Sequence, residues 1–149
     1  MCSSYVSLND SWRRINYENR GEFPAVPEHC DNSDIDGSYS SSYINLTSGW
    51  YRFTGAAGTK LPTAPAPRGG PSSGNQICGT NVVPYISSGD NPTIEDGIVN
   101  RDVCWEWGSH NCEWKSTVKV AACRDAQGDY LVYELQPAPG CAAAYCAIP

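Results

Sequence analysis

The sequence predicts a β-rich, small disulfide-stabilised domain with short helical turns and long loops. The chain has eight cysteines in 149 residues, and an even set of this density is typical of a disulfide framework formed in an oxidising compartment. It also has 14 glycines and 11 prolines, residues that interrupt regular elements. Because this length suits one domain, we expect covalent bridges to supplement a single modest core.

Charge and hydropathy exclude two classes of interaction. The formal net charge is −6 and no stripe of basic residues exists, which disfavours nucleic acid because phosphate binding requires a basic surface. No apolar run reaches the ~18 residues that cross a bilayer. We therefore expect an extracellular protein, secreted or on the cell surface, with no nucleic acid partner and no membrane insertion.

The expected organisation is one domain with a distinct N-terminal part. Residues 1–29 form a polar and aromatic segment with a short opening strand or hairpin, which belongs to the same domain through Cys2. Residues 30–149 form the main body. Because Met1 stands directly before a framework cysteine, we expect the chain to be part of a larger one.

The N-terminal half is expected to contain one clear strand between two loops. Asp, Asn, Ser and Gly dominate residues 30–48, which predicts an exposed loop. The run GWYRF at 49–53 predicts a half-buried strand with Trp50 or Phe53 in the core. Residues 61–79 are rich in proline and glycine and predict a meandering loop.

The C-terminal half is expected to be more ordered. Residues 96–104 suit one helical turn or a short strand, and a stretch this short leaves both open. Residues 116–123 and 130–135 predict a β-hairpin, with Gly128 supplying a positive φ in the connection. The tail at 141–146 has room for one helical turn at most.

Three tryptophans lie within ten residues, in the run WEWGSHNCEW at 105–114. Tryptophans this dense either anchor a core or form an adhesive surface, and packing is the commoner use in a small disulfide-rich domain. The alternative is a carbohydrate-binding, lectin-like module. In that interpretation Trp105, Trp107 and Trp114 stack on sugar rings.

Six short motifs, in order, resemble the eight-cysteine domain of the uromodulin and pancreatic glycoprotein 2 family. They are GWYRF at 49–53, DGIVNRDVCWEW at 96–107, CEW at 112–114, TVKVAAC at 117–123, YLVYEL at 130–135 and CAAAYC at 141–146. The resemblance implies a non-catalytic recognition or scaffolding module of a secreted or surface glycoprotein. Its partner would be an extracellular protein or a glycan-binding molecule.

The resemblance also implies a disulfide pairing, which spacing alone leaves open among roughly a hundred connectivities. The implied bridges are Cys2–Cys141, Cys30–Cys123, Cys78–Cys146 and Cys104–Cys112. The first three close long loops and are expected to stabilise most strongly.

In uromodulin this module presents an N-linked glycan that bacterial pilus adhesins bind. The position similar to the family's acceptor is Ser88 here, so that sequon is absent. Two other sequons exist, at Asn9 and Asn45. We expect Asn45 to be exposed in its polar loop and glycosylated. The plainer alternative is a chance sequon in a loop rich in Ser and Asn.

Metal and catalytic sites are not expected. Residues 32–37 resemble the start of an EF-hand loop, but Asn32 and Tyr43 replace the carboxylates of its first and twelfth positions. Weak calcium candidates remain in a turn that is otherwise solvated: Asp31, Asp34 and Asp36. No Gly-x-Ser-x-Gly or His-Glu-x-x-His motif is present. We therefore expect no enzyme activity and no cofactor.

Overall fold

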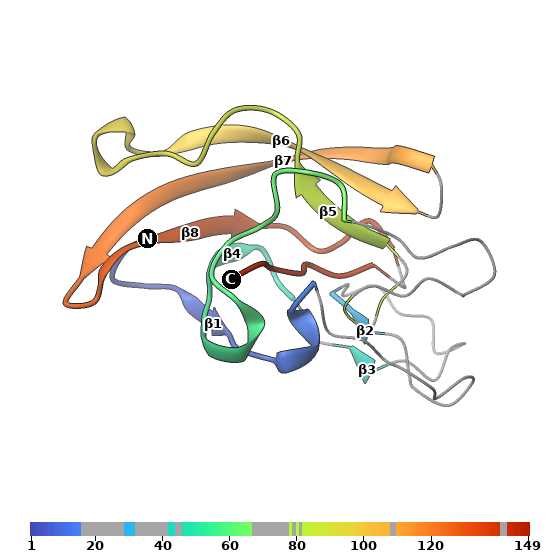
Figure 1. Cartoon of the computed structure of the whole chain (residues 1–149), viewed down its shortest axis with the longest axis horizontal. Helices are drawn as coiled ribbons and strands as arrows, with labels where there is room; N and C mark the ends of the chain where they lie inside the picture. The colour runs from blue at the N-terminus through green and yellow to red at the C-terminus, as the bar shows by residue number, and fades with distance from the viewer. Residues whose placement is uncertain are drawn as a thin grey trace.

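A computed structural model describes most of the chain, namely residues 1–15, 29–31, 42–43, 46–66, 78, 80, 82–107, 110–140 and 143–149. Its main feature is a six-stranded sheet in the order β1-β4-β8-β7-β6-β5 (Figure 1). The strands are β1 (Val6–Leu8), β4 (Gly49–Phe53), β5 (Val82–Ile86), β6 (Val99–Trp107), β7 (His110–Asp125) and β8 (Gly128–Leu135). A small parallel pair lies apart from this sheet and consists of β2 (His29–Cys30) and β3 (Ser42–Tyr43).

Helical structure within the described ranges is limited to three 3-10 turns. These are η1 (Ser11–Arg13), η2 (Gly55–Ala57) and η3 (Ile94–Asp96). The predicted class, a β-rich disulfide-stabilised domain with short helical turns, is confirmed. No helix in this part of the chain is long and apolar enough to cross a membrane.

The predicted hairpin is present and longer than expected. Strands β7 and β8 pair antiparallel from Lys119↔Glu134 to Asp125↔Gly128. Gly128 has a φ of 121°, a value that glycine adopts without steric cost. The alternation of polar and apolar residues in β7 therefore predicted both the strand and its partner correctly.

The two faces of the sheet carry different clusters. One face bears the main core, where Val120, Phe53 and Tyr133 are at most 1% exposed. The rings of Phe53 and Tyr133 meet edge to face at 5.8 Å. Trp50 lies on the opposite face, in a smaller cluster with Val132. The expectation of Trp50 or Phe53 in the core is thus met by Phe53.

The C-terminal half contains one strand that sequence reasoning missed. Strand β5 pairs with β6 from Val82↔Trp107 to Ile86↔Val103, and Pro84 lies in its centre. Proline interrupts the usual strand pattern, but β5 stands at the end of the six-stranded order, and edge positions tolerate its missing N–H. The ambiguous residues 96–104 contain the last residue of η3 and most of β6.

Both ends of the chain join the body of the domain. Strand β1 pairs in parallel with β4, so the N-terminal segment opens with a strand and not a hairpin. The described tail is extended, not helical, with bridges from Ala143 to Val82 and from Ala147 to Arg14. The sheet and the tail are therefore held against the same N-terminal segment.

The prediction of an exposed loop over 30–48 is wrong at its two ends. Cys30, Asp31 and Leu46 are at most 1% exposed. Residues 32–41 and 44–45 lie outside the described part of the chain. A disulfide, an ion pair and a core contact bury the ends, and a composition rich in turn residues does not reveal such partners.

Three disulfides are described, and one corrects the implied pairing. They are Cys2–Cys123, Cys78–Cys146 and Cys104–Cys112. The last two agree with the resemblance, whereas the implied Cys2–Cys141 and Cys30–Cys123 bridges are wrong because Cys2 bonds Cys123. Cys30 is disulfide-bonded too, while Cys141 lies outside the described residues.

The physical reason for this correction lies at the N-terminus. Tyr130 stands opposite Cys123 in the β7–β8 hairpin, and its hydroxyl donates a hydrogen bond to the Cys2 carbonyl at 3.1 Å. The ring of Tyr5 meets that of Tyr130 edge to face at 5.9 Å. These contacts hold the first residues over β8, within reach of β7.

Candidate functional site

The Asn9 sequon lies where β1 ends and η1 begins. Asn9 is exposed, as a glycan acceptor must be. The preceding Leu8 is 4% exposed and lies opposite Phe53, and its carbonyl accepts the Thr54 N–H at 3.0 Å. The residue before the acceptor is thus fixed in the sheet and the core.

The residues after Asn9 are held by a buried ion pair. Asp10 accepts a hydrogen bond from Nε of Arg13 at 3.0 Å, and the Arg13 side chain is fully buried. The two terminal nitrogens of Arg13 donate to the two carboxylate oxygens of Asp31 at 2.6 and 2.7 Å. A bidentate pair of this kind fixes orientation as well as distance.

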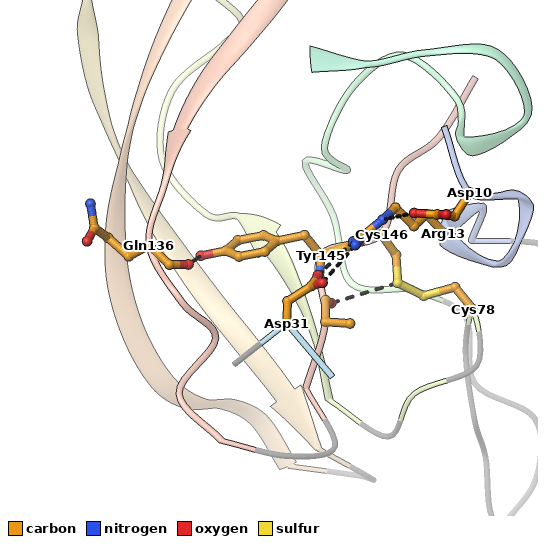
Figure 2. A network of polar contacts seen from close by, with 8 residues as sticks. Asp10, Arg13, Asp31, Cys78, Gln136, Tyr145 and Cys146 are labelled. Carbon is orange, nitrogen blue, oxygen red and sulfur yellow. Dashed lines mark hydrogen bonds and ion pairs between the residues drawn. A yellow bond between two sulfur atoms is a disulfide. The ribbon is translucent and has the colours of Figure 1, made fainter. Parts of the chain in front are cut away.

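The same network reaches the C-terminal tail (Figure 2). The Tyr145 N–H donates to Asp31 at 2.8 Å, and the Tyr145 carbonyl accepts from Arg13 at 2.9 Å. The Tyr145 hydroxyl points the other way and donates to the Gln136 carbonyl at 2.8 Å. Arg13 and Asp31 therefore join η1, the end of β2 and the tail into one unit beneath Asn9.

Electrostatics keep this pair charged. Burial alone would lower the pKa of Arg13, but hydrogen bonds and charge from Asp31, and then from Asp10, offset burial and raise that pKa. The main-chain groups of Tyr145 supply further partners. A buried ion pair needs such additional hydrogen bonds to compensate for its desolvation.

Asp31 is not available as a calcium ligand, which corrects one of the weak candidates. Both of its carboxylate oxygens are engaged by Arg13, and the residue has no exposed surface. Asp34 and Asp36 lie outside the described residues. Within the described ranges, no group of three His, Cys, Asp or Glu side chains is placed to hold a metal ion.

The three tryptophans occupy different environments. Trp105 is 1% exposed, donates from Nε1 to the Ser116 hydroxyl at 2.9 Å and packs against Tyr145. It belongs to the core and has no surface for a sugar, so that candidate is wrong. Trp114 stands opposite Trp105 and is 43% exposed. Trp107 lies in β6, and its side chain is outside the described part.

The position similar to the family's glycan acceptor has a structural use here. The Ser88 hydroxyl accepts a hydrogen bond from the Asp102 N–H at 2.9 Å. Asn45 lies outside the described residues. The next two residues of its sequon differ, because Leu46 is buried in the core and Thr47 is exposed.

Sequence reasoning missed Arg13 and Tyr145, the two residues that complete the network around Asp31. Neither lies in a recognisable motif, and their separation of 132 residues hides the contact. One available signal is position, because Asp31 and Tyr145 each stand beside a framework cysteine. Charged and aromatic residues next to disulfides deserve a structural interpretation before a metal-binding one.

The fold and its bridges define a class, namely small disulfide-bonded β-sheet modules. Within this class, the family model for the uromodulin-like eight-cysteine domain matches residues 51–147. The chain belongs to this family.

Known relatives extend the match over nearly the whole chain. It is 40% identical to rat pancreatic secretory granule membrane major glycoprotein GP2 and 39% identical to the mouse protein, over 99% of this chain and 23% of each relative. It is 31% identical to rat uromodulin over 99% of this chain and 18% of that protein. The chain thus spans less than a quarter of these relatives and corresponds to the uromodulin-like domain that they contain.

Proposed function

We propose that this domain is a non-catalytic, extracellular recognition module that presents N-linked glycans, with Asn9 as the acceptor on the described surface. The observation that carries the proposal is the exposed Asn9 on a backbone fixed at both sides. Leu8 is bonded into the sheet before it, and the buried Arg13 holds Asp10 after it.

A fixed base matters because a folded partner recognises a glycan most tightly when little freedom is lost on binding. Asn9 meets this condition through the Arg13–Asp31 pair. Asn45 is the second proposed acceptor, in a sequon whose Thr47 is exposed. The partner is a glycan-binding protein such as a pilus adhesin.

An extracellular location, secreted or at the cell surface, belongs to the same proposal. Disulfides persist in oxidising compartments, and this domain has at least three. The relatives named as a secretory granule membrane glycoprotein agree with that setting. A larger chain that carries this domain is also part of the proposal, since the relatives are several times longer.

One observation favours a second function, the binding of carbohydrate by the domain itself. Trp114 is 43% exposed, and an exposed indole face can stack on a sugar ring. Because Trp105 is buried, this alternative depends on Trp114 and Trp107. A glycan array with Trp114→Ala as the comparison distinguishes the two functions, because glycan presentation does not need the indole.

The test is adhesin binding to protein made in a eukaryotic secretory pathway. An immobilised pilus adhesin is offered the wild type, Asn9→Gln, Asn45→Gln and the double variant. We expect each single variant to lose part of the binding and the double variant to lose all of it. Full binding by the double variant would overturn the proposal.

A matched pair isolates the glycan at Asn9 from its side chain. Ser11→Ala destroys the sequon but keeps Asn9, whereas Ser11→Thr keeps both. Ser11 is exposed, so neither change disturbs the core. Binding should fall for Ser11→Ala and persist for Ser11→Thr.

A further inference from the structure

We propose that the Cys104–Cys112 disulfide is redox-labile, and that a dithiol opens it while the rest of the fold stays intact. The bond joins β6 to β7 near the end of their hairpin and closes a ring with a sequence separation of 8. Two features that favour attack coincide here, namely a strained backbone and an accessible cysteine.

The strain lies in the backbone of Cys112, whose φ is 59°. Residues with a Cβ pay a steric cost in this left-handed region. The bond is also out of register with the ladder, in which Cys104 stands opposite Lys115. Opening the bond frees residue 112 to adopt an extended conformation, so reduction relieves the strain.

Neither of the other described bridges combines strain with access. Cys78 also has a left-handed φ of 47°, but it and Cys146 have no exposed surface. Cys2 is exposed, yet neither it nor Cys123 is among the residues with positive φ. Cys112 is half-buried, so a small thiolate has a path to its sulfur.

The sheet does not depend on this bond. Strands β6 and β7 remain paired on the far side of it, from Trp105↔Trp114 to Val99↔Val120. Trp105 is also fixed by its hydrogen bond to Ser116. We therefore expect opening to loosen the hairpin end between residues 104 and 112 and to leave the core unchanged.

The step is a thiol–disulfide exchange. A dithiol's thiolate attacks Sγ of Cys112, the S–S bond breaks, and the Cys104 thiolate leaves and takes up a proton. The dithiol's second thiol then attacks the mixed disulfide and releases Cys112 as a thiol. The reductant is oxidised to its own disulfide, and the protein gains two electrons and two protons.

Dithiothreitol tests the proposal on the native, fully oxidised protein. Samples are taken over time, quenched with N-ethylmaleimide and mapped by mass spectrometry, while circular dichroism follows the fold. We expect Cys104 and Cys112 to be alkylated about tenfold faster than any other cysteine, before the circular dichroism changes. Earlier alkylation of any other pair, or alkylation of all cysteines together as the fold is lost, would overturn the proposal.

Two variants control the assignment. Cys104→Ser/Cys112→Ser should lose the fast phase and keep the slow ones. Cys2→Ser/Cys123→Ser should keep the fast phase at an unchanged rate. A fast phase that survives in the first variant would contradict the proposal. If either variant fails to fold, the order of alkylation in the wild type decides alone.

Discussion

Arg13 and Asp31 form a bidentate ion pair in which neither side chain has exposed surface. The pair connects residues 18 positions apart and is bonded on its far side to Tyr145, so three segments meet at it. It fixes the turn that follows Asn9. The stability of the domain and the presentation of a glycan thus depend on the same contact.

Asp31→Asn should destabilise the domain by about 3–5 kcal/mol, because the change leaves the Arg13 charge buried without its counterion. Urea unfolding followed by tryptophan fluorescence measures the loss. Asp10→Asn is the control, since the Asp10 side chain is 37% exposed and such pairs contribute about 1 kcal/mol or less. Equal losses in the two variants would contradict a central role for Asp31.

Trp105→Ala and Trp114→Ala should differ sharply in stability although the two residues face each other in the ladder. Removing the buried Trp105 leaves a cavity beside Tyr145 and should cost about 3–5 kcal/mol. Removing the exposed Trp114 should cost about 1 kcal/mol or less. Thermal unfolding compares them, and a large loss for Trp114→Ala would place that side chain in the core.

The bridges should rank by loop length. In the chain-entropy model a sequence separation of 121 gives Cys2–Cys123 about 5 kcal/mol, whereas a separation of 8 gives Cys104–Cys112 about 2.5 kcal/mol. Replacing each pair by serine and measuring urea midpoints tests the order. A greater loss from the short ring would refute the entropic ranking.

Asp125 should titrate below its usual pKa of 3.8, chiefly because the Gln127 N–H bonds its carboxylate and secondarily because Arg52 pairs with it. A lowered folded pKa stabilises the domain above the unfolded pKa, and this contribution is lost as the pH falls through the folded value. Carboxyl NMR titration should show the Asp125 pKa rising partway towards 3.8 in Arg52→Gln.

Asp129 is the internal control for that titration. Its pKa is lowered by Arg124, not by Arg52, and should stay unchanged in Arg52→Gln. A shift of both carboxylates by the same amount would indicate a general change in the field and not the loss of one ion pair.

Local pattern predicted some of these elements well. The alternation in 116–123 and 130–135 marks one face for the core, and Gly128 suits the turn, so the hairpin followed directly. Strand β5 was missed because Pro84 breaks its pattern, and only the edge position explains its tolerance. The tryptophans did not disclose that one of a facing pair is buried and the other exposed.

Long-range partners could not be predicted from the same information. Spacing does not determine which cysteines bond, and the family resemblance placed Cys2 on the wrong partner. Asp31 resembled a cation ligand because its neighbours are acidic and polar. Its actual partner, Arg13, comes from a turn whose position depends on the whole sheet.

Glycan occupancy at Asn9 tests the central claim most directly. Glycopeptide mapping of the protein secreted by eukaryotic cells, with and without N-glycosidase, measures the occupied fraction at Asn9 and Asn45 separately. We predict that Asn9 carries an N-glycan, because it is exposed next to a turn that the buried Arg13 holds in place. An Asn9 found without glycan in this material would contradict the account.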